Sequence, residues 1–271
     1  MTTQERFQGP IPEVYERLFV PLIFEPYAED LAGRIVAFKP DNVLEIAAGT
    51  GVVTRAMAAR LGPHVAIVAT DLSPAMLDVA KARQANDPRI AWQTADAMAL
   101  PFPDERFDLA VCQFGAMFFP GKVGGYSEAR RVLRPRGHFL FNVWDGLAAN
   151  DFARAAHEAL GAIFPGSPPD FMARIPHGYF DEATIRAQLT EAGFSDIHFE
   201  AVAAESRAPT ALQAATAYCQ GTPMRPEIES RAPGALAEVT SRVAEVFVER
   251  FGDGPVTGNI RAFVVQATRP S

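Results

Sequence analysis

The sequence predicts an α/β fold in which helices cover a doubly wound, mostly parallel sheet of seven strands. Three observations lead to this prediction. Short apolar runs alternate with segments of helical composition, a glycine-rich turn follows the first run, and 48% of the 271 residues are hydrophobic. Short strands that are apolar along their whole length are typical of parallel sheets covered on both faces. We expect one domain over residues 1–271.

The N-terminal segment, residues 1–40, is predicted to be helical from residue 12 to residue 38. Apolar residues recur there at helical spacing, but Pro21 and Pro26 lie inside the pattern. A proline in a helix interior removes a backbone hydrogen bond and clashes with the preceding turn. We therefore expect a break or a kink at these two residues.

Residues 41–145 are predicted to alternate between strands and helices. Ser73 and Pro74 are typical of a helix start, as N-cap and first helical residue. Pro135 and Gly137 are expected to end a helix before the fifth strand. The predicted strands are 42–47, 64–70, 90–94, 107–113 and 138–144, and the predicted helices are 52–61, 73–84 and 127–133.

Residues 146–271 are less regular. The predicted helices are 152–164, 181–192, 210–220 and 226–251, and the predicted strands are 197–203 and 261–268. The last two helices stand between the last two strands. We therefore predict a helical insertion, about residues 205–252, that caps the active site before a final strand at about 260–268. Additional packing helices are the alternative.

The composition narrows the classes of function. A net charge of −7 and a pI near 5.3 argue against nucleic-acid binding, which needs a positive surface. No apolar run reaches 18 residues and no basic-then-apolar leader is evident, so we expect a cytoplasmic protein without a membrane span. Cys112 and Cys219 have no nearby ligand partners, so no metal site is expected.

The first predicted strand runs into the sequence Glu-Ile-Ala-Ala-Gly-Thr-Gly, residues 45–51. Glycines allow a sharp turn and a close approach of the backbone to a ligand, and the following helix offers free N–H groups at its first turn. Asp71 ends the second strand, 20 residues after Gly51. An acid at this place can accept hydrogen bonds from both hydroxyls of a ribose, so a nucleotide-like ligand is expected at the carboxyl ends of the strands.

Two residues distinguish the candidate ligands. A dinucleotide-binding turn has a third glycine where this sequence has Thr54. Glu45 would repel a pyrophosphate but would attract a cationic amino group. An NAD(P)-dependent oxidoreductase is therefore the weaker alternative.

Four segments carry a more specific resemblance: VLEIAAGTG, VATDLSPAMLDVAKA, ADAMALPFPDERFDLAVCQFGAMFF and RVLRPRGHFLFNVWD. In them the chain resembles the class I S-adenosylmethionine-dependent methyltransferases, in particular the small-molecule branch that includes the ubiquinone/menaquinone-biosynthesis type. The resemblance is strong over residues 40–145. It implies a Rossmann-like fold, S-adenosylmethionine as cofactor and S-adenosylhomocysteine as product.

The resemblance also implies a role for each matching residue. Glu45 would hold the methionine amino group, Asp71 the ribose hydroxyls, and Asp96 the adenine 6-amino group. The other implied cofactor residues are Ala47, Ala48, Gly49, Thr50 and Gly51 in the turn, Leu72, Met76 and Ala97 at the adenine, and Gln113 and Phe114 beside the methionine part. Family members usually have glycine in place of Ala47, so close backbone approach is less certain there.

Each of these residues also has an ordinary structural interpretation. Asp71 with Ser73 and Pro74 is compatible with a simple helix entry, Asp96 with a turn cap, and Met76 with core packing. These interpretations do not explain why all of these residues occur together at this spacing, namely Glu45, the two glycines, Asp71 and Asp96.

The predicted reaction is an in-line transfer of the methyl group to a small molecule, apolar or aromatic. The cofactor activates the methyl group, so positioning and exclusion of water are the main tasks. No pattern identifies a catalytic base. The candidate substrate residues are Tyr15, Phe19, Tyr27, Phe118 and His177; helix packing equally explains the aromatic ones, and a surface loop explains His177. A non-catalytic cofactor-binding protein is the main alternative, and a homodimer is compatible with the sequence.

Overall fold

The structure is a computed structural model that describes residues 9–84 and 86–271. By its internal contacts the chain forms two compact units, each made of three segments. Unit 1 contains the N-terminal segment up to Glu25, Asp145–Tyr179 and Ala203–Arg261, and unit 2 contains Pro26–Trp144, Phe180–Val202 and Ala262–Ser271. Residues 41–144 of the region with the strong resemblance therefore fall within unit 2.

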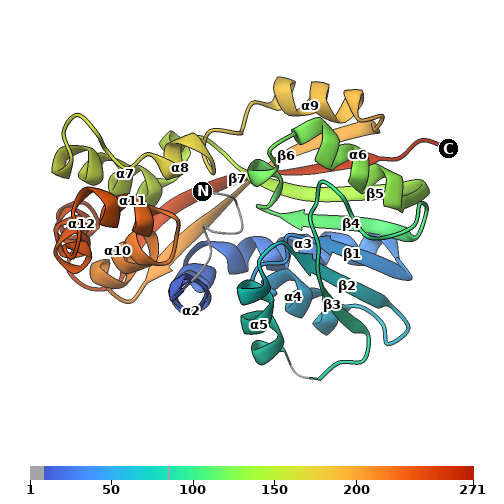
Figure 1. Cartoon of the computed structure of the whole chain (residues 1–271), viewed down its shortest axis with the longest axis horizontal. Helices are drawn as coiled ribbons and strands as arrows, with labels where there is room; N and C mark the ends of the chain where they lie inside the picture. The colour runs from blue at the N-terminus through green and yellow to red at the C-terminus, as the bar shows by residue number, and fades with distance from the viewer. Residues whose placement is uncertain (1–8, 85) are drawn as a thin grey trace. The chain divides into compact units, whose positions relative to one another are not determined.

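Seven strands form one sheet in the order β3-β2-β1-β4-β5-β7-β6 (Figure 1), which confirms the predicted fold class. Their bounds are β1 (Asn42–Ile46), β2 (Ala66–Asp71), β3 (Ile90–Thr94), β4 (Phe107–Gln113), β5 (Leu133–Trp144), β6 (Ser195–Ala208) and β7 (Val256–Thr268). β1 pairs in parallel with β2 and β4, β2 with β3, and β4 with β5. β7 pairs with β5 antiparallel. The carboxyl ends of β1 to β5 therefore meet at one edge of the sheet.

Helices cover both faces of this sheet. On one face, α3 (Glu25–Phe38) and α4 (Val52–Arg60) share an apolar cluster with β-strand residues such as Val43 and Leu140. Neighbouring residues on a strand point to opposite faces, so Phe139 and Phe141 face the other side. There they contact Tyr126 of α6 (Lys122–Val132). The helices α5 (Pro74–Arg83) and α9 (Glu182–Glu191) complete this part of the fold.

The helix does not break at Pro21 or Pro26, but it departs from α-helical geometry around Pro21. The chain is helical through α2 (Ile11–Val14), a π-helix η1 (Tyr15–Phe24) and α3. Pro21 lies inside the π-helix and Pro26 is the second residue of α3, which continues directly from the π-helix. Proline has no backbone N–H, so neither residue donates a hydrogen bond to the preceding turn.

The predicted strand at 138–144 begins earlier than expected, at Leu133. Phe107 of β4 pairs with Leu133 and Leu109 with His138, so the register shifts over the intervening residues. Arg136 has a left-handed backbone, with φ of 65°. A bulge of this kind leaves room for Pro135, which cannot donate to a regular ladder.

Unit 1 is mainly helical. The predicted helix 226–251 is two helices, because Pro233 and Gly234 separate them and Gly234 has a φ of 79°. Rings of Phe152, Phe247 and Phe251 pack together in this unit. Besides α2 and η1 its helices are α7 (Asp151–Ile163), α8 (Phe171–Arg174), α10 (Ala211–Gln220), α11 (Met224–Arg231) and α12 (Leu236–Phe251). Two 3₁₀ turns, η2 (Ala116–Phe118) and η3 (Leu147–Ala149), complete the fold. None of the described helices has the length and apolar character that crossing a membrane requires.

Candidate cofactor-binding site

The turn between β1 and α4 has the backbone geometry that its glycines predict. Gly49 and Gly51 are left-handed, with φ of 56° and 81°. A Cβ on Gly51 would lie 2.9 Å from the Trp92 ring, so glycine is required there on two grounds. Ala47 is left-handed too, with φ of 56°, although it carries a Cβ. A left-handed non-glycine residue costs roughly 1–2 kcal/mol, so this departure from the usual glycine is strained.

Asp71 ties this turn to the next helix. Its Oδ2 accepts a hydrogen bond from the Gly49 N–H at 2.8 Å, and its Oδ1 accepts one from the Ser73 N–H at 2.8 Å. Ser73 in turn caps α5 at the Met76 N–H, as expected. Each carboxylate oxygen keeps further lone pairs, so Asp71 serves helix entry and can still accept hydrogen bonds from a ligand. Burial raises its pKa, and the backbone N–H groups oppose that shift.

Glu45 lies at the carboxyl end of β1 and is buried, with 2% of its surface exposed. Its Oε2 accepts a hydrogen bond from the Thr54 hydroxyl at 2.5 Å. Among the residues that the structure describes, no basic side chain forms an ion pair with it. Burial raises the pKa of Glu45 to about 8, although the Thr54 hydrogen bond lowers it. A cationic amino group would supply the ion-pair partner that this carboxyl lacks among the described residues.

Thr54 is a site residue that the sequence patterns did not assign. In the sequence it stands out only as a missing glycine, but it is completely buried and fixes the Glu45 carboxyl. The available signal was a hydroxyl on the apolar face of a short helix, beside Val53 and Met57. The Thr50 hydroxyl oxygen is also buried and accepts no hydrogen bond from a described residue. The strand ends thus fit a ligand with an amino group and ribose hydroxyls.

The residues expected at the adenine lie after β2 and after β3. Asp96 is exposed, and its Oδ1 accepts a hydrogen bond from the Met98 N–H at 2.9 Å. Asp96 therefore caps the turn through its Oδ1, in agreement with the turn-capping interpretation. Leu72 and Ala97 are half-buried. Met76 is buried, and its methyl lies 3.6 Å from the place where a Cβ on Gly49 would stand.

The turn after β4 contacts the turn after β1. Gln113 is half-buried at the end of β4, and Phe114 is left-handed with φ of 52°. The Phe114 ring stacks on Trp144 with centroids 3.9 Å apart. A Cβ on Gly115 would lie only 2.5 Å from the Ala47 Cβ. The Ala47 methyl therefore occupies the space that glycine at position 115 leaves open.

The aromatic substrate candidates make packing contacts, and their contact with a substrate stays a prediction. Tyr27 is completely buried between Phe114 and Trp144, and its hydroxyl donates to the Val202 carbonyl at 3.1 Å. Tyr15 and Phe19 lie in the π-helix of unit 1, where their rings are 5.7 Å apart. These contacts favour the helix-packing interpretation. Phe118 is half-buried in the 3₁₀ turn η2 and belongs to unit 2.

The interpretation of His177 as a surface loop residue is wrong. It is 5% exposed, and its Nδ1 lies 2.7 Å from the Asp145 carbonyl oxygen. A carbonyl only accepts hydrogen bonds, so Nδ1 carries the hydrogen and Nε2 is the basic nitrogen. Burial lowers the pKa of His177 to about 4, which keeps the ring neutral at pH 7. Contact with a substrate stays a prediction.

The two cysteines are buried. Burial raises the pKa of each thiol to about 12. Among the described residues, no group of three His, Cys, Asp or Glu side chains is placed to hold a metal ion.

Comparisons with known proteins agree on one family. Residues 43–137 match a family described as methyltransferase domain. A demethylmenaquinone methyltransferase of Deinococcus radiodurans is 35% identical over 134 residues, 49% of this chain and 52% of the relative. A ubiquinone/menaquinone biosynthesis C-methyltransferase of Neisseria meningitidis is 30% identical over 175 residues, 61% of this chain and 71% of the relative. The alignments thus span from about half to about 70% of these relatives.

A solved structure shows the same fold. It is a phosphoethanolamine N-methyltransferase of Haemonchus contortus in complex with phosphomonomethylethanolamine and S-adenosylhomocysteine. The TM-score is 0.60 at 18% identity, over 96% of this chain and 57% of the other.

Proposed function

The chain belongs to the class I S-adenosylmethionine-dependent methyltransferases, and we propose that it transfers the cofactor's methyl group to a small aromatic acceptor by in-line displacement. One observation carries the proposal. Glu45, buried and in no ion pair with a described residue, and Asp71 stand at the carboxyl ends of adjacent strands, joined through a left-handed glycine turn. A metabolite with a cationic amino acid end and a ribose matches this pair of acids.

Each residue would hold a different part of the cofactor. The Glu45 carboxylate, fixed by Thr54, would bind the ammonium group, and Asp71 would accept hydrogen bonds from the ribose hydroxyls. The first turn of α4 offers N–H groups toward the same ligand. When bound, the cofactor supplies a methyl group already activated on a sulfonium. The protein then has to align the acceptor and exclude water.

The names of the relatives support the class of acceptor. They act in menaquinone and ubiquinone biosynthesis, one of them as a C-methyltransferase. We therefore propose a hydroquinone-type ring as the acceptor. Such a ring agrees with the aromatic or apolar acceptor predicted from the sequence.

Calorimetric titration with S-adenosylhomocysteine tests the cofactor. We expect micromolar binding to the wild type and at least about 100-fold weaker binding to Asp71→Ala, because two hydrogen bonds to a charged group are lost. Asp108→Ala is a matched control. Its carboxylate likewise accepts two backbone N–H groups, from Asp41 and Asn42, but at the amino end of β1. Its affinity should stay within about twofold of the wild type.

The outcomes separate the competing functions. A wild type that binds NAD⁺ and not S-adenosylhomocysteine would contradict the proposal. Release of S-adenosylhomocysteine from S-adenosylmethionine, dependent on an added hydroquinone lacking the ring methyl, would establish catalysis. Binding without release over a series of aromatic acceptors would favour a non-catalytic cofactor-binding protein.

A further inference from the structure

The turn that carries Asp96 has little support of its own. It lies in the connection between β3 and β4. Its first half is held by the Ala95 N–H, which donates to the Asp71 carbonyl at 3.0 Å. The turn itself is closed by the Ala99 N–H, which donates to the Asp96 carbonyl at 3.0 Å. Asp96 is exposed, so packing does not fix it. The position of the turn therefore also depends on the residues on its C-terminal side.

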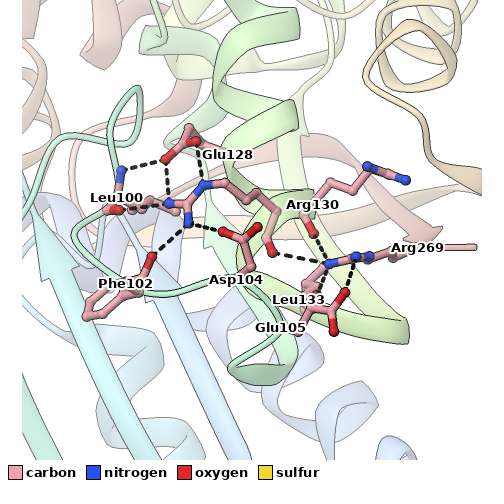
Figure 2. Close-up of polar contacts among 9 residues, drawn as sticks. Leu100, Phe102, Asp104, Glu105, Glu128, Arg130, Leu133 and Arg269 are labelled. Carbon is pink, nitrogen blue, oxygen red and sulfur yellow. Dashed lines mark hydrogen bonds and ion pairs between the residues drawn. The ribbon is translucent and has the colours of Figure 1, made fainter.

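Arg131 of α6 fastens the chain immediately after this turn. All five of its N–H donors are used. Two N–H groups donate to the Glu128 carboxylate, at 2.8 and 2.9 Å. Two more donate to backbone carbonyls, that of Leu100 at 2.9 Å and that of Phe102 at 2.7 Å. The fifth donates to the Asp104 carboxylate at 2.7 Å. Figure 2 shows these acceptors around one guanidinium. Glu128 also accepts the Leu100 N–H at 2.8 Å. Both backbone polar groups of Leu100 are thus bound to α6.

The same helix also supports the turn from its amino-terminal side. A Cβ on Gly124 would lie 2.9 Å from the Met98 methyl, and one on Gly121 would lie 3.4 Å from it. Glycine inside a helix costs about 1 kcal/mol relative to alanine. The Met98 side chain therefore uses a gap that α6 keeps open at a cost to its own stability.

We propose that Arg131 is a positioning residue for recognition of the adenine ring, acting through the Asp96 turn. The proposal rests on the proposed function and on the role that the family resemblance implies for Asp96, which is to accept a hydrogen bond from the adenine 6-amino group. One Asp96 oxygen is taken by the Met98 N–H, and the other accepts no hydrogen bond from a described residue. Its direction depends on the turn, and α6 fixes the turn at Met98 and at Leu100.

The test compares two ligands that differ at the purine 6-position. S-adenosylhomocysteine has an amino group there and an unprotonated N1, whereas S-inosylhomocysteine has a carbonyl, which the Asp96 carboxylate would repel, and a hydrogen on N1. The ratio of their dissociation constants measures recognition of this edge of the purine, to which Asp96 contributes one contact. We expect Asp96→Ala to reduce the preference strongly and Arg131→Lys, which keeps the charge but loses the planar fork, to reduce it at least about fivefold. Gly124→Ala, which crowds Met98, should reduce it as well.

Arg269→Lys is the matched control. Arg269 donates to the carbonyls of Arg130, Arg131 and Leu133 and to the Glu105 carboxylate, so it clamps the same helix end without touching residues 96–104 (Figure 2). The ligand ratio should stay within about twofold in this variant.

The outcomes distinguish the inference from the proposed function. If Arg131→Lys and Gly124→Ala lower the affinity for both ligands by the same factor, the contacts of Arg131 with the turn have only a structural role and the inference is wrong. An unchanged ratio in Asp96→Ala would overturn it as well. If the wild type binds neither ligand, the proposed function itself fails.

Discussion

At the scale of single residues, the Glu45 carboxyl of the ligand-free protein carries a proton, although this carboxyl is expected to bind the positively charged amino group of the cofactor. Burial raises the pKa of Glu45 from 4.5 to about 8, so this carboxyl is mainly protonated at pH 7. The charged groups that act on it are Arg55, which lowers its pKa, and Asp71, which raises it. An ammonium group beside Glu45 would favour the carboxylate. Binding below pH 8 should therefore release this proton.

This coupling predicts opposite pH dependences for stability and affinity. Between pH 4.5 and 8 the folded protein binds the Glu45 proton more tightly than the unfolded chain does, so this group's contribution to stability falls as pH rises. The slope is up to about 1.4 kcal/mol per pH unit. His177, with its pKa lowered to about 4, acts in the opposite direction below about pH 6.5. Glu45 is therefore best observed between about pH 6.5 and pH 8.

Urea unfolding and calorimetry over this range provide the measurement. Relative to the wild type, Glu45→Gln should lose the downward slope of stability. In the wild type, affinity for S-adenosylhomocysteine should rise by up to about tenfold per pH unit toward pH 8. The variant should bind weakly, without that rise. Parallel curves for the two proteins would show that Glu45 is already ionised.

At the scale of elements, the turns after β1 and β4 interlock through one methyl group. A Cβ on Gly115 would meet the Ala47 Cβ at 2.5 Å and the Cys112 sulfur at 2.7 Å. Gly115→Ala should therefore destabilise the protein by about 1–3 kcal/mol, as overpacked substitutions do. The same change in an Ala47→Gly background should cost about 1 kcal/mol less, since one of the two contacts is gone. Urea titration of the four proteins gives the coupling, and strictly additive effects would rule out the interlock.

The sequence predicted most elements but not how the chain passes between them. The predicted β3 and β4 match the structure at both ends, because apolar runs bounded by polar residues mark buried strands. At Pro21 and Pro135 the chain differs from the expected elements, since a π-helix and a bulge absorb them. Both features depend on the tertiary structure, which local residue propensities do not predict.

The residues of the candidate cofactor site were likewise predictable from the sequence only in part. Glu45, the glycines and Asp71 could be found from spacing along the chain, because each ends a strand or begins a turn. Thr54 and Arg131 could not, since their importance lies in partners 9 to 31 positions away. The burial of His177 depends on the fold of unit 1, which no local pattern indicated.

At the scale of the whole molecule, the two units share continuous strands. β6 runs across the boundary at Val202 and β7 across the boundary at Arg261. All the candidate cofactor residues lie in unit 2. Because both strands continue from one unit into the other, we expect both units to unfold together. Ligand at about 100 times its dissociation constant should then stabilise both by about 2.7 kcal/mol.

Hydrogen exchange with and without S-adenosylhomocysteine checks this expectation. The slowest amides of α12 in unit 1 and of β1 in unit 2 should gain the same protection. A gain confined to unit 2 would show that the units unfold independently.

The strand order also has a consequence for how the chain is made. β7 is the last strand in the sequence, but it lies between β5 and β6. While the ribosome is still synthesising residues before Val256, β5 has no neighbour on that side and β6 has no place in the sheet. The nascent chain therefore carries an exposed strand edge until β7 emerges, and such an edge invites pairing with other chains. Chaperone demand should be greatest in this interval, after the cofactor-binding strands are complete but before the sheet has closed.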